Sequence, residues 1–169
     1  MNRAGYNGKL LPPWYEEALA SLTEFRTHEL NRVFCRTRLL SEGGTLGGRA
    51  EIDFDGSSVR DGDWRPLLAE ALEGRGVLAF DKLAQLDFSS LELVDVATGM
   101  AILEWLASRE PGALGRFHAA LRSGQPHGGT RVIQDGPRRQ RMYDAAFQAA
   151  AGMGFRQADQ EWREWFPGP

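Results

Sequence analysis

Apolar positions recur at two different spacings along the chain and predict a helical start, an alternating middle and a helical second half. Four apolar residues near the beginning follow the spacing of one helix face: Trp14, Ala18, Leu22 and Phe25. This pattern predicts a helix over 14–27. The residues before it, 1–13, are rich in Gly and Asn and end in two prolines, so we expect an extended lead-in.

The middle of the chain alternates between apolar and polar residues, as half-buried strands do. The stretches "NRVFCRTRLL" and "RAEIDFDG" both follow this period of two, and the Gly-rich "SEGGTLGG" separates them. The pattern predicts a small β-hairpin over 31–55, with arginines on one strand facing acidic residues on the other.

The second half, 63–166, carries several helix patterns with clear stop signals. The segment "WRPLLAEALEG" predicts a short helix that Gly74 ends. A capping-box spacing at Ser89 and Glu92 precedes a long apolar stripe, and Pro111 ends that helix and starts the next. We expect "QPHGGTRVIQDGPRRQ" to be a loop, and "MYDAAFQAAAG" and "FRQADQEWREWF" to be short helices. The fold class predicted is α+β, mainly α, in a single domain over 1–169.

Composition narrows the classes of partner. With 169 residues, 42% of them hydrophobic, the chain can build the core of one domain. Its formal charge of -3 gives no overall attraction to nucleic acid, and the arginines of "RVIQDGPRRQR" lack interleaved aromatics, so we expect no nucleic-acid partner. No window approaches the ~18 apolar residues of a membrane span, and the start has no signal-peptide core. We expect a soluble protein of unknown compartment.

Few residues suggest local chemistry. The histidines are far apart, and His28-Glu29 is not followed by the second histidine of H-E-x-x-H, so no local metal site is predicted. Cys35 is the single cysteine and is expected to be a buried thiol. Asp53 and Asp55 would share one side of a strand, which suits either a cation or a plain hairpin surface.

The most informative stretch is "LPPWYEEALASL", which places Glu16 and Glu17 in the first turn of the predicted helix. Acidic residues are favoured there by the helix dipole without any metal, and Glu16 is interpreted in that way. The stretch also resembles the Trp-x-x-Glu-Gly-x-Ala segment of the peptidase MA-like gluzincins, bacterial zinc metallopeptidase-like proteins. The resemblance places Trp14 at the packing position and Glu17 at the third zinc ligand.

Two later segments extend this resemblance over roughly residues 8–166. The stretch from "VLAFDKLAQLDF" to "FHAALRSG" is similar to the family's long helix pair after the site. The stretch "YDAAFQAAAGMGFRQADQEWREWF" is similar to its closing pattern, in which a helix, a Gly break and a Trp-containing helix follow one another. The resemblance implies a helical gluzincin C-terminal-type domain.

Departures from the family pattern limit the function that the resemblance implies. In this chain Ala18 stands where the family has a Gly after the ligand, and Ser21 stands where the family often has an acidic residue. Asp95 and Val96 stand where a Tyr commonly opens the family's long helix. The H-E-x-x-H segment would lie about twenty residues before Glu17, just upstream of Met1. If it is supplied there, the implied chemistry is zinc-activated water attacking a peptide carbonyl.

Two functions therefore stay open. The first is the C-terminal part of a zinc metallopeptidase-like protein, not catalytically competent as this chain, with zinc bound only if further ligands come from outside it. The second is a non-catalytic interaction or scaffold module of degenerate peptidase fold with a protein or peptide partner. In that case four tryptophans would be core or interface anchors: Trp64, Trp105, Trp162 and Trp165.

Overall fold

The described part of the chain is mostly helical, and no strand occurs within it. The computed structural model describes residues 11–28, 64–74, 76–86, 90–124 and 136–166. The helices in these ranges are α1 (Pro13–His28), α4 (Trp64–Glu73), α5 (Phe80–Leu83), α6 (Leu93–Arg109), α7 (Ala113–Gly124), α8 (Gly136–Ala151) and α9 (Phe155–Trp165). The mainly helical class is therefore confirmed, whereas the hairpin predicted over 31–55 lies outside the described residues.

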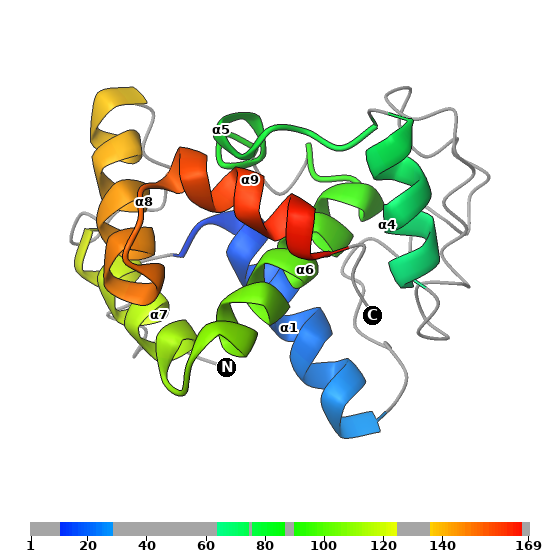
Figure 1. The fold of residues 1–169 in the computed structure, drawn as a ribbon, viewed down its shortest axis with the longest axis horizontal. Helices are drawn as coiled ribbons and strands as arrows, with labels where there is room; N and C mark the ends of the chain where they lie inside the picture. Colours follow the sequence, from blue (N-terminus) through cyan, green and yellow to red (C-terminus); the bar gives the residue numbers. More distant parts are fainter. Residues whose placement is uncertain (1–10, 29–63, 75, 87–89, 125–135, 167–169) are drawn as a thin grey trace, which may run out of the picture.

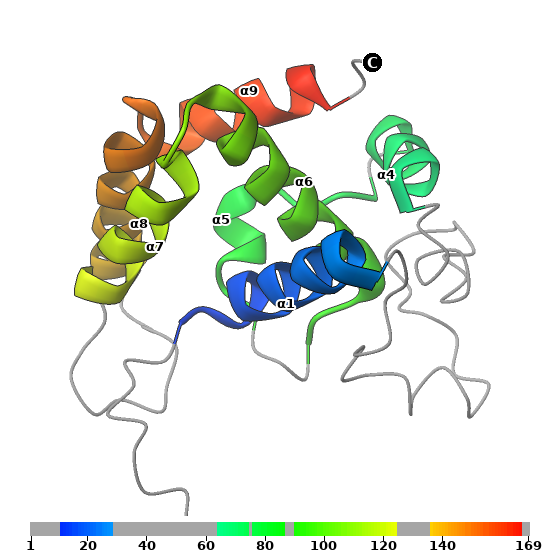
Figure 2. The same ribbon diagram turned by 90° about the horizontal axis from the view of Figure 1, so that it is seen from below.

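Helix α6 lies in the middle of the described part, with the other helices around it (Figure 1). It is buried on nearly all sides between Leu93 and Leu106, which is why its sequence is apolar beyond a single stripe. Helices α1 and α9 pack on opposite sides of α6, α4 lies near its beginning, and α7 and α8 lie side by side beyond its end (Figures 1 and 2). The arrangement is a helical assembly around one central helix.

The contact between α1 and α6 depends on a glycine. Trp14 and Ala18 are fully buried on the face of α1 that meets α6, and Gly99 is the α6 residue opposite them. A Cβ atom added at Gly99 would lie 2.7 Å from the Cβ of Ala18, which is too close for two carbon atoms. The small residues at this crossing therefore set how closely α1 approaches α6.

An aromatic cluster connects the start of α1 with α5, α7 and α8. The ring of Trp14 lies 5.4 Å from Phe80 and 6.4 Å from Phe117, both in edge-on geometry. Phe117 and Phe147 bring α7 and α8 together with ring centroids 4.8 Å apart. Because these rings are buried, they contribute both apolar area and favourable edge-to-face contacts to the core.

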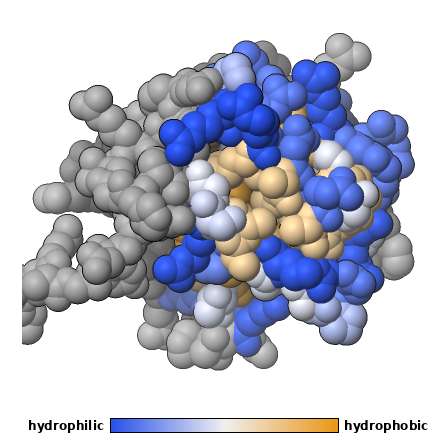
Figure 3. All heavy atoms as spheres, turned by 90° about the vertical axis from the view of Figure 1, so that its left-hand side faces the viewer, coloured by the Kyte–Doolittle hydropathy of each residue, from blue (hydrophilic) through white to orange (hydrophobic). Residues whose placement is uncertain are grey.

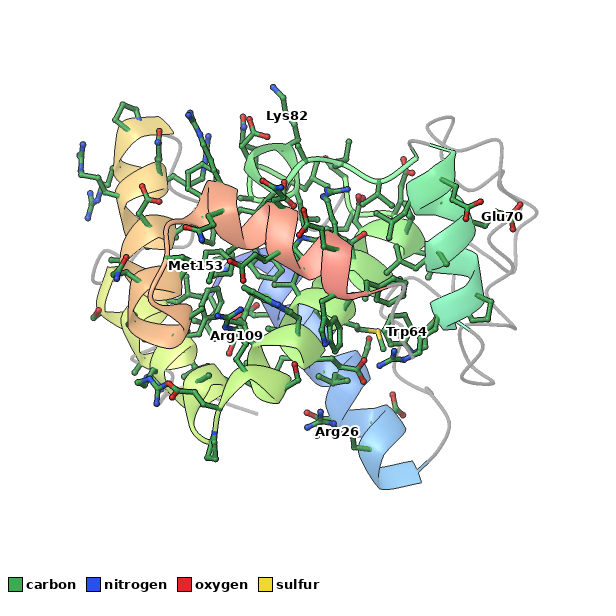
Figure 4. The ribbon with its side chains drawn as sticks, in the orientation of Figure 1. Arg26, Trp64, Glu70, Lys82, Arg109 and Met153 are labelled. Carbon is green, nitrogen blue, oxygen red and sulfur yellow. The ribbon has the colours of Figure 1, made fainter. Side chains whose placement is uncertain are left out.

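Three of the four later tryptophans are core residues. Trp64, Trp105 and Trp162 are each at most 4% exposed. Trp165 is half-buried against the same core. Figure 4 shows Trp64 at the end of α4 that faces α6 and α9, where its ring lies 5.9 Å from that of Phe166. The core interpretation is thus confirmed for the first three.

Two local predictions were wrong. Helix α6 is capped by Glu92 paired with Asp95, not by Ser89 paired with Glu92: the backbone N–H of Glu92 donates to Asp95 at 2.8 Å. Helix α8 begins at Gly136, so "GPRRQ" is helical and not part of a loop. Pro137 is compatible with this start because a residue in the first turn of a helix needs no N–H partner within that helix.

Candidate functional site

The beginning of α1 carries Glu17, the residue that the sequence resemblance singles out. Trp14 and Ala18 turn into the core, and Glu17 lies half-buried on the flank of the same turn. Ser21 follows one helical turn later on that flank, is only 1% exposed, and its hydroxyl has no hydrogen-bond partner within the described part. The Glu17 carboxylate and the buried Ser21 hydroxyl therefore lie one helical turn apart on the same side of α1.

Glu16 does more than add surface charge to the first turn. It is half-buried, and one of its carboxylate oxygens accepts the backbone N–H of Leu11 at 3.2 Å. Burial raises the pKa of Glu16, the Leu11 N–H lowers it, and the neighbouring Glu17 carboxylate raises it. The two acidic groups therefore repel each other at this end of α1.

The described residues do not complete a metal site around Glu17. They contain no group of three or more His, Cys, Asp or Glu side chains close enough to hold an ion. Four candidates from the sequence lie outside the described residues: Cys35, Asp53, Asp55 and His127. Zinc needs at least three protein ligands, so the described residues do not by themselves complete the metal site predicted at Glu17.

His118 lies beside a tyrosine of α1. It is half-buried on α7, and its Nδ1 atom is hydrogen-bonded to the hydroxyl of Tyr15 at 2.9 Å. Burial raises the pKa of Tyr15 to about 12, so its hydroxyl is neutral at physiological pH. Burial and the nearby Arg122 cation lower the pKa of His118. The pair is a hydrogen-bonded link between α1 and α7.

A second hydrogen bond of the same kind links α1 to α8. The indole N–H of Trp14 donates to the hydroxyl of Tyr143 at 2.9 Å, and both side chains are buried. Burial raises the pKa of Tyr143, which keeps the phenol protonated, although the Trp14 N–H and the Arg139 cation both act in the opposite direction. Trp14 thus holds the start of α1 against the aromatic cluster by packing and by one buried hydrogen bond.

Tyr143 also borders a pocket of about 490 Å³ between α5, α8 and α9. Sequence analysis missed this pocket because its residues come from three separate segments. The one local signal is the spacing of Arg139 and Tyr143, which are four residues apart and therefore share a face of α8.

A second surface feature lies on the face of the molecule formed by α7 and α8. Figure 3 shows that apolar side chains gather in the middle of this face and that hydrophilic ones surround them.

Comparisons with protein-family models, curated proteins and solved structures find no match to this chain. Among the described helices, none combines the length and the apolar character needed to cross a bilayer.

Proposed function

We propose that this chain is the C-terminal helical part of a zinc metallopeptidase-like protein of the gluzincin type, with Glu17 at the third zinc-ligand position. The observation that supports this most is the placement of Glu17. It lies half-buried on the flank of a helix whose neighbouring face, at Trp14 and Ala18, is fixed against α6. A ligand on such a rigid element is held in a defined position, which a metal site requires.

Two properties of the α1 flank fit a site completed from outside the described residues. The hydroxyl of Ser21 is buried without a hydrogen-bond partner among the described residues, and an unsatisfied buried hydroxyl costs about 1–3 kcal/mol. The carboxylates of Glu16 and Glu17 repel each other, and a bound cation would offset that repulsion. Further polar groups beside this flank would supply a partner for the Ser21 hydroxyl, and a cation there would offset the repulsion between the two carboxylates.

We assign no catalytic step to the chain itself. A gluzincin site takes two histidines and a glutamate base from H-E-x-x-H, and that motif does not occur in the sequence. The hairpin predicted over 31–55 also belongs to this proposal as a prediction. In this account the chain provides one ligand and the helical support behind it.

The coding sequence before Met1 tests the proposal. We expect an in-frame H-E-x-x-H segment about twenty residues before Glu17 in the native protein. A native protein without that motif would overturn the zinc assignment. It would leave the non-catalytic interaction or scaffold module, which the apolar area on the face of α7 and α8 favours (Figure 3).

A further inference from the structure

Helices α7 and α8 pack as an antiparallel pair, so their outward sides form one continuous face. A Cβ atom added at Gly124, the last residue of α7, would lie 2.6 Å from Cγ of Met142 in the first half of α8. Near the beginning of α7, Nε of Arg116 donates to the backbone carbonyl of Ala149 in the second half of α8 at 2.9 Å. Figure 3 shows the face that results.

The middle of this face is made of small apolar side chains. Ala119 on α7 and Ala145 and Ala149 on α8 are exposed, whereas the aromatic rings of both helices are buried. Ala145 and Ala149 are four residues apart and therefore lie on the same side of α8. Because a methyl group projects little from a helix, a further helix could approach this face closely.

The same two helices carry an excess of positive charge. Together they contain five arginines and one acidic residue, although the formal charge of the whole chain is -3. The one acidic residue, Asp144, is half-buried and accepts the backbone N–H of Phe155, at the start of α9, at 3.0 Å. The charge of Arg116 is offset by an ion pair with Glu110. The excess of positive charge therefore lies toward the other end of the pair.

Two arginines at that end border the alanines. Arg122 and Arg141 are exposed and lie close in sequence to Gly124 and Met142, where the two helices touch. Neither arginine makes an ion pair within the described part. Arg122 follows Ala119 by three residues and Arg141 precedes Ala145 by four, so each arginine shares a helix side with an exposed alanine.

This combination of charge and shape fits an acidic helix better than a nucleic acid. The buried rings of α7 and α8 leave no aromatic surface on which bases could stack. Alanine side chains also have no donor or acceptor with which to read base edges. A helix with a small apolar stripe flanked by carboxylates would instead cover the alanines and place its charges beside the arginines.

We propose that the face of α7 and α8 binds an acidic amphipathic helix of a partner protein. The apolar stripe of that helix lies over Ala119, Ala145 and Ala149. Its flanking carboxylates pair with Arg122 and Arg141, whose guanidinium groups can each bind two carboxylate oxygens. The inference does not depend on zinc at Glu17, because every residue that carries it lies on α7 or α8.

A synthetic amphipathic helix of about 18 residues, with an alanine and leucine stripe flanked by glutamates, tests the proposal. The matched probe has glutamine in place of every glutamate. We expect the glutamate peptide to bind about tenfold more tightly at low salt, because several exposed ion pairs act together. The preference should fall to about twofold near 0.5 M salt, where surface charges are screened. Calorimetry measures affinity, and chemical-shift changes should gather on α7 and α8.

Charge-removing variants locate the binding face. Arg122→Gln and Arg141→Gln should each weaken binding of the glutamate peptide by about two- to fivefold and leave the glutamine peptide nearly unchanged. Arg26→Gln is the matched control, since Arg26 is exposed near the end of α1 that lies away from α7 and α8 (Figures 2 and 4). We expect its affinity for both peptides to stay within about twofold of the parent.

A bulkier side chain in the middle of the face tests its shape. Ala145→Gln should weaken both peptides by about fivefold or more, because the larger side chain holds a helix off the surface. Ala20→Gln, at an exposed position of α1, is the control and should change neither affinity. Circular dichroism establishes that each variant is folded.

Several results would overturn the proposal. They are equal affinity for the two peptides at low salt, no binding at millimolar concentration, chemical-shift changes centred away from α7 and α8, and an equal loss in Arg26→Gln. Tighter binding of a short DNA duplex than of the glutamate peptide would also overturn it, because the positive charge would then serve phosphate binding.

Discussion

Trp14 shows how much of the fold depends on one side chain near the start of the described chain. Its ring packs against Phe80 and Phe117, and its N–H is satisfied by the hydroxyl of Tyr143, 129 residues away in sequence. A buried indole N–H without an acceptor would be costly. Trp14 therefore joins α1 to α8 and fixes the helix that carries Glu17.

Removing the acceptor of this hydrogen bond should destabilise the protein. Tyr143→Phe keeps the ring but leaves the buried N–H of Trp14 without a partner, so we expect a loss of about 1–3 kcal/mol in the free energy of unfolding. Tyr15→Phe is the matched control, because its partner His118 is half-buried and can turn to water. Urea denaturation measures both. A loss in Tyr143→Phe no larger than in Tyr15→Phe would contradict the role given to this bond.

His118 should titrate at lower pH than an ordinary histidine. Its pKa in the folded state is lowered from 6.5 by burial and by Arg122, so the unfolded state binds protons more readily. The stability contributed by neutral His118 is thus present above pH 6.5 and is lost as pH falls through the folded-state pKa. NMR titration, with His118→Gln to assign the resonance, checks this. A pKa at or above 6.5 would show that the environment described here is wrong.

At the scale of elements, helices with strong apolar periodicity were predicted well, whereas a short helix without such periodicity was not. The helix expected over 14–27 is observed as Pro13–His28, and the stop at Pro111 agrees with the end of α6 at Arg109. Helix α5 was missed because four residues carry too little periodicity, and its first N–H is capped by Asp159 from α9. Tertiary contacts of that kind have no local sequence signal.

The crossing of α1 and α6 leads to a paired glycine test. Gly99→Ala would place a Cβ 2.7 Å from Ala18, so we expect a loss of about 1–3 kcal/mol even though alanine favours a helix. Gly115→Ala, on α7, meets no atom within 4 Å and should stabilise by up to about 1 kcal/mol. Thermal or urea unfolding gives both values. Similar effects from the two substitutions would mean that the crossing is not tightly packed.

At the scale of the whole molecule, the sequence predicted positions on helices better than it predicted neighbours. It placed Trp14 in the core and Glu16 in the first turn of a helix, whereas Glu17 follows just after that turn because α1 begins at Pro13. It did not predict that Phe80, Tyr143 and Phe155 would border one pocket, because those residues come from segments whose contact depends on how α5, α8 and α9 pack. The arginines of "GPRRQR" show the same limit: Arg138 and Arg141 are exposed, as the sequence indicated, but Arg139 is half-buried and lines the pocket.

The central claim concerns zinc at Glu17, and the zinc content of the purified native-length protein tests it most directly. We predict about one zinc per chain, retained in Glu16→Gln and lost in Glu17→Gln. Glu16 is a matched neighbour, since it carries the same charge in the same helical turn but bonds the backbone of Leu11. Zinc retained in Glu17→Gln at the parent level, or absent from the parent protein, would contradict the account.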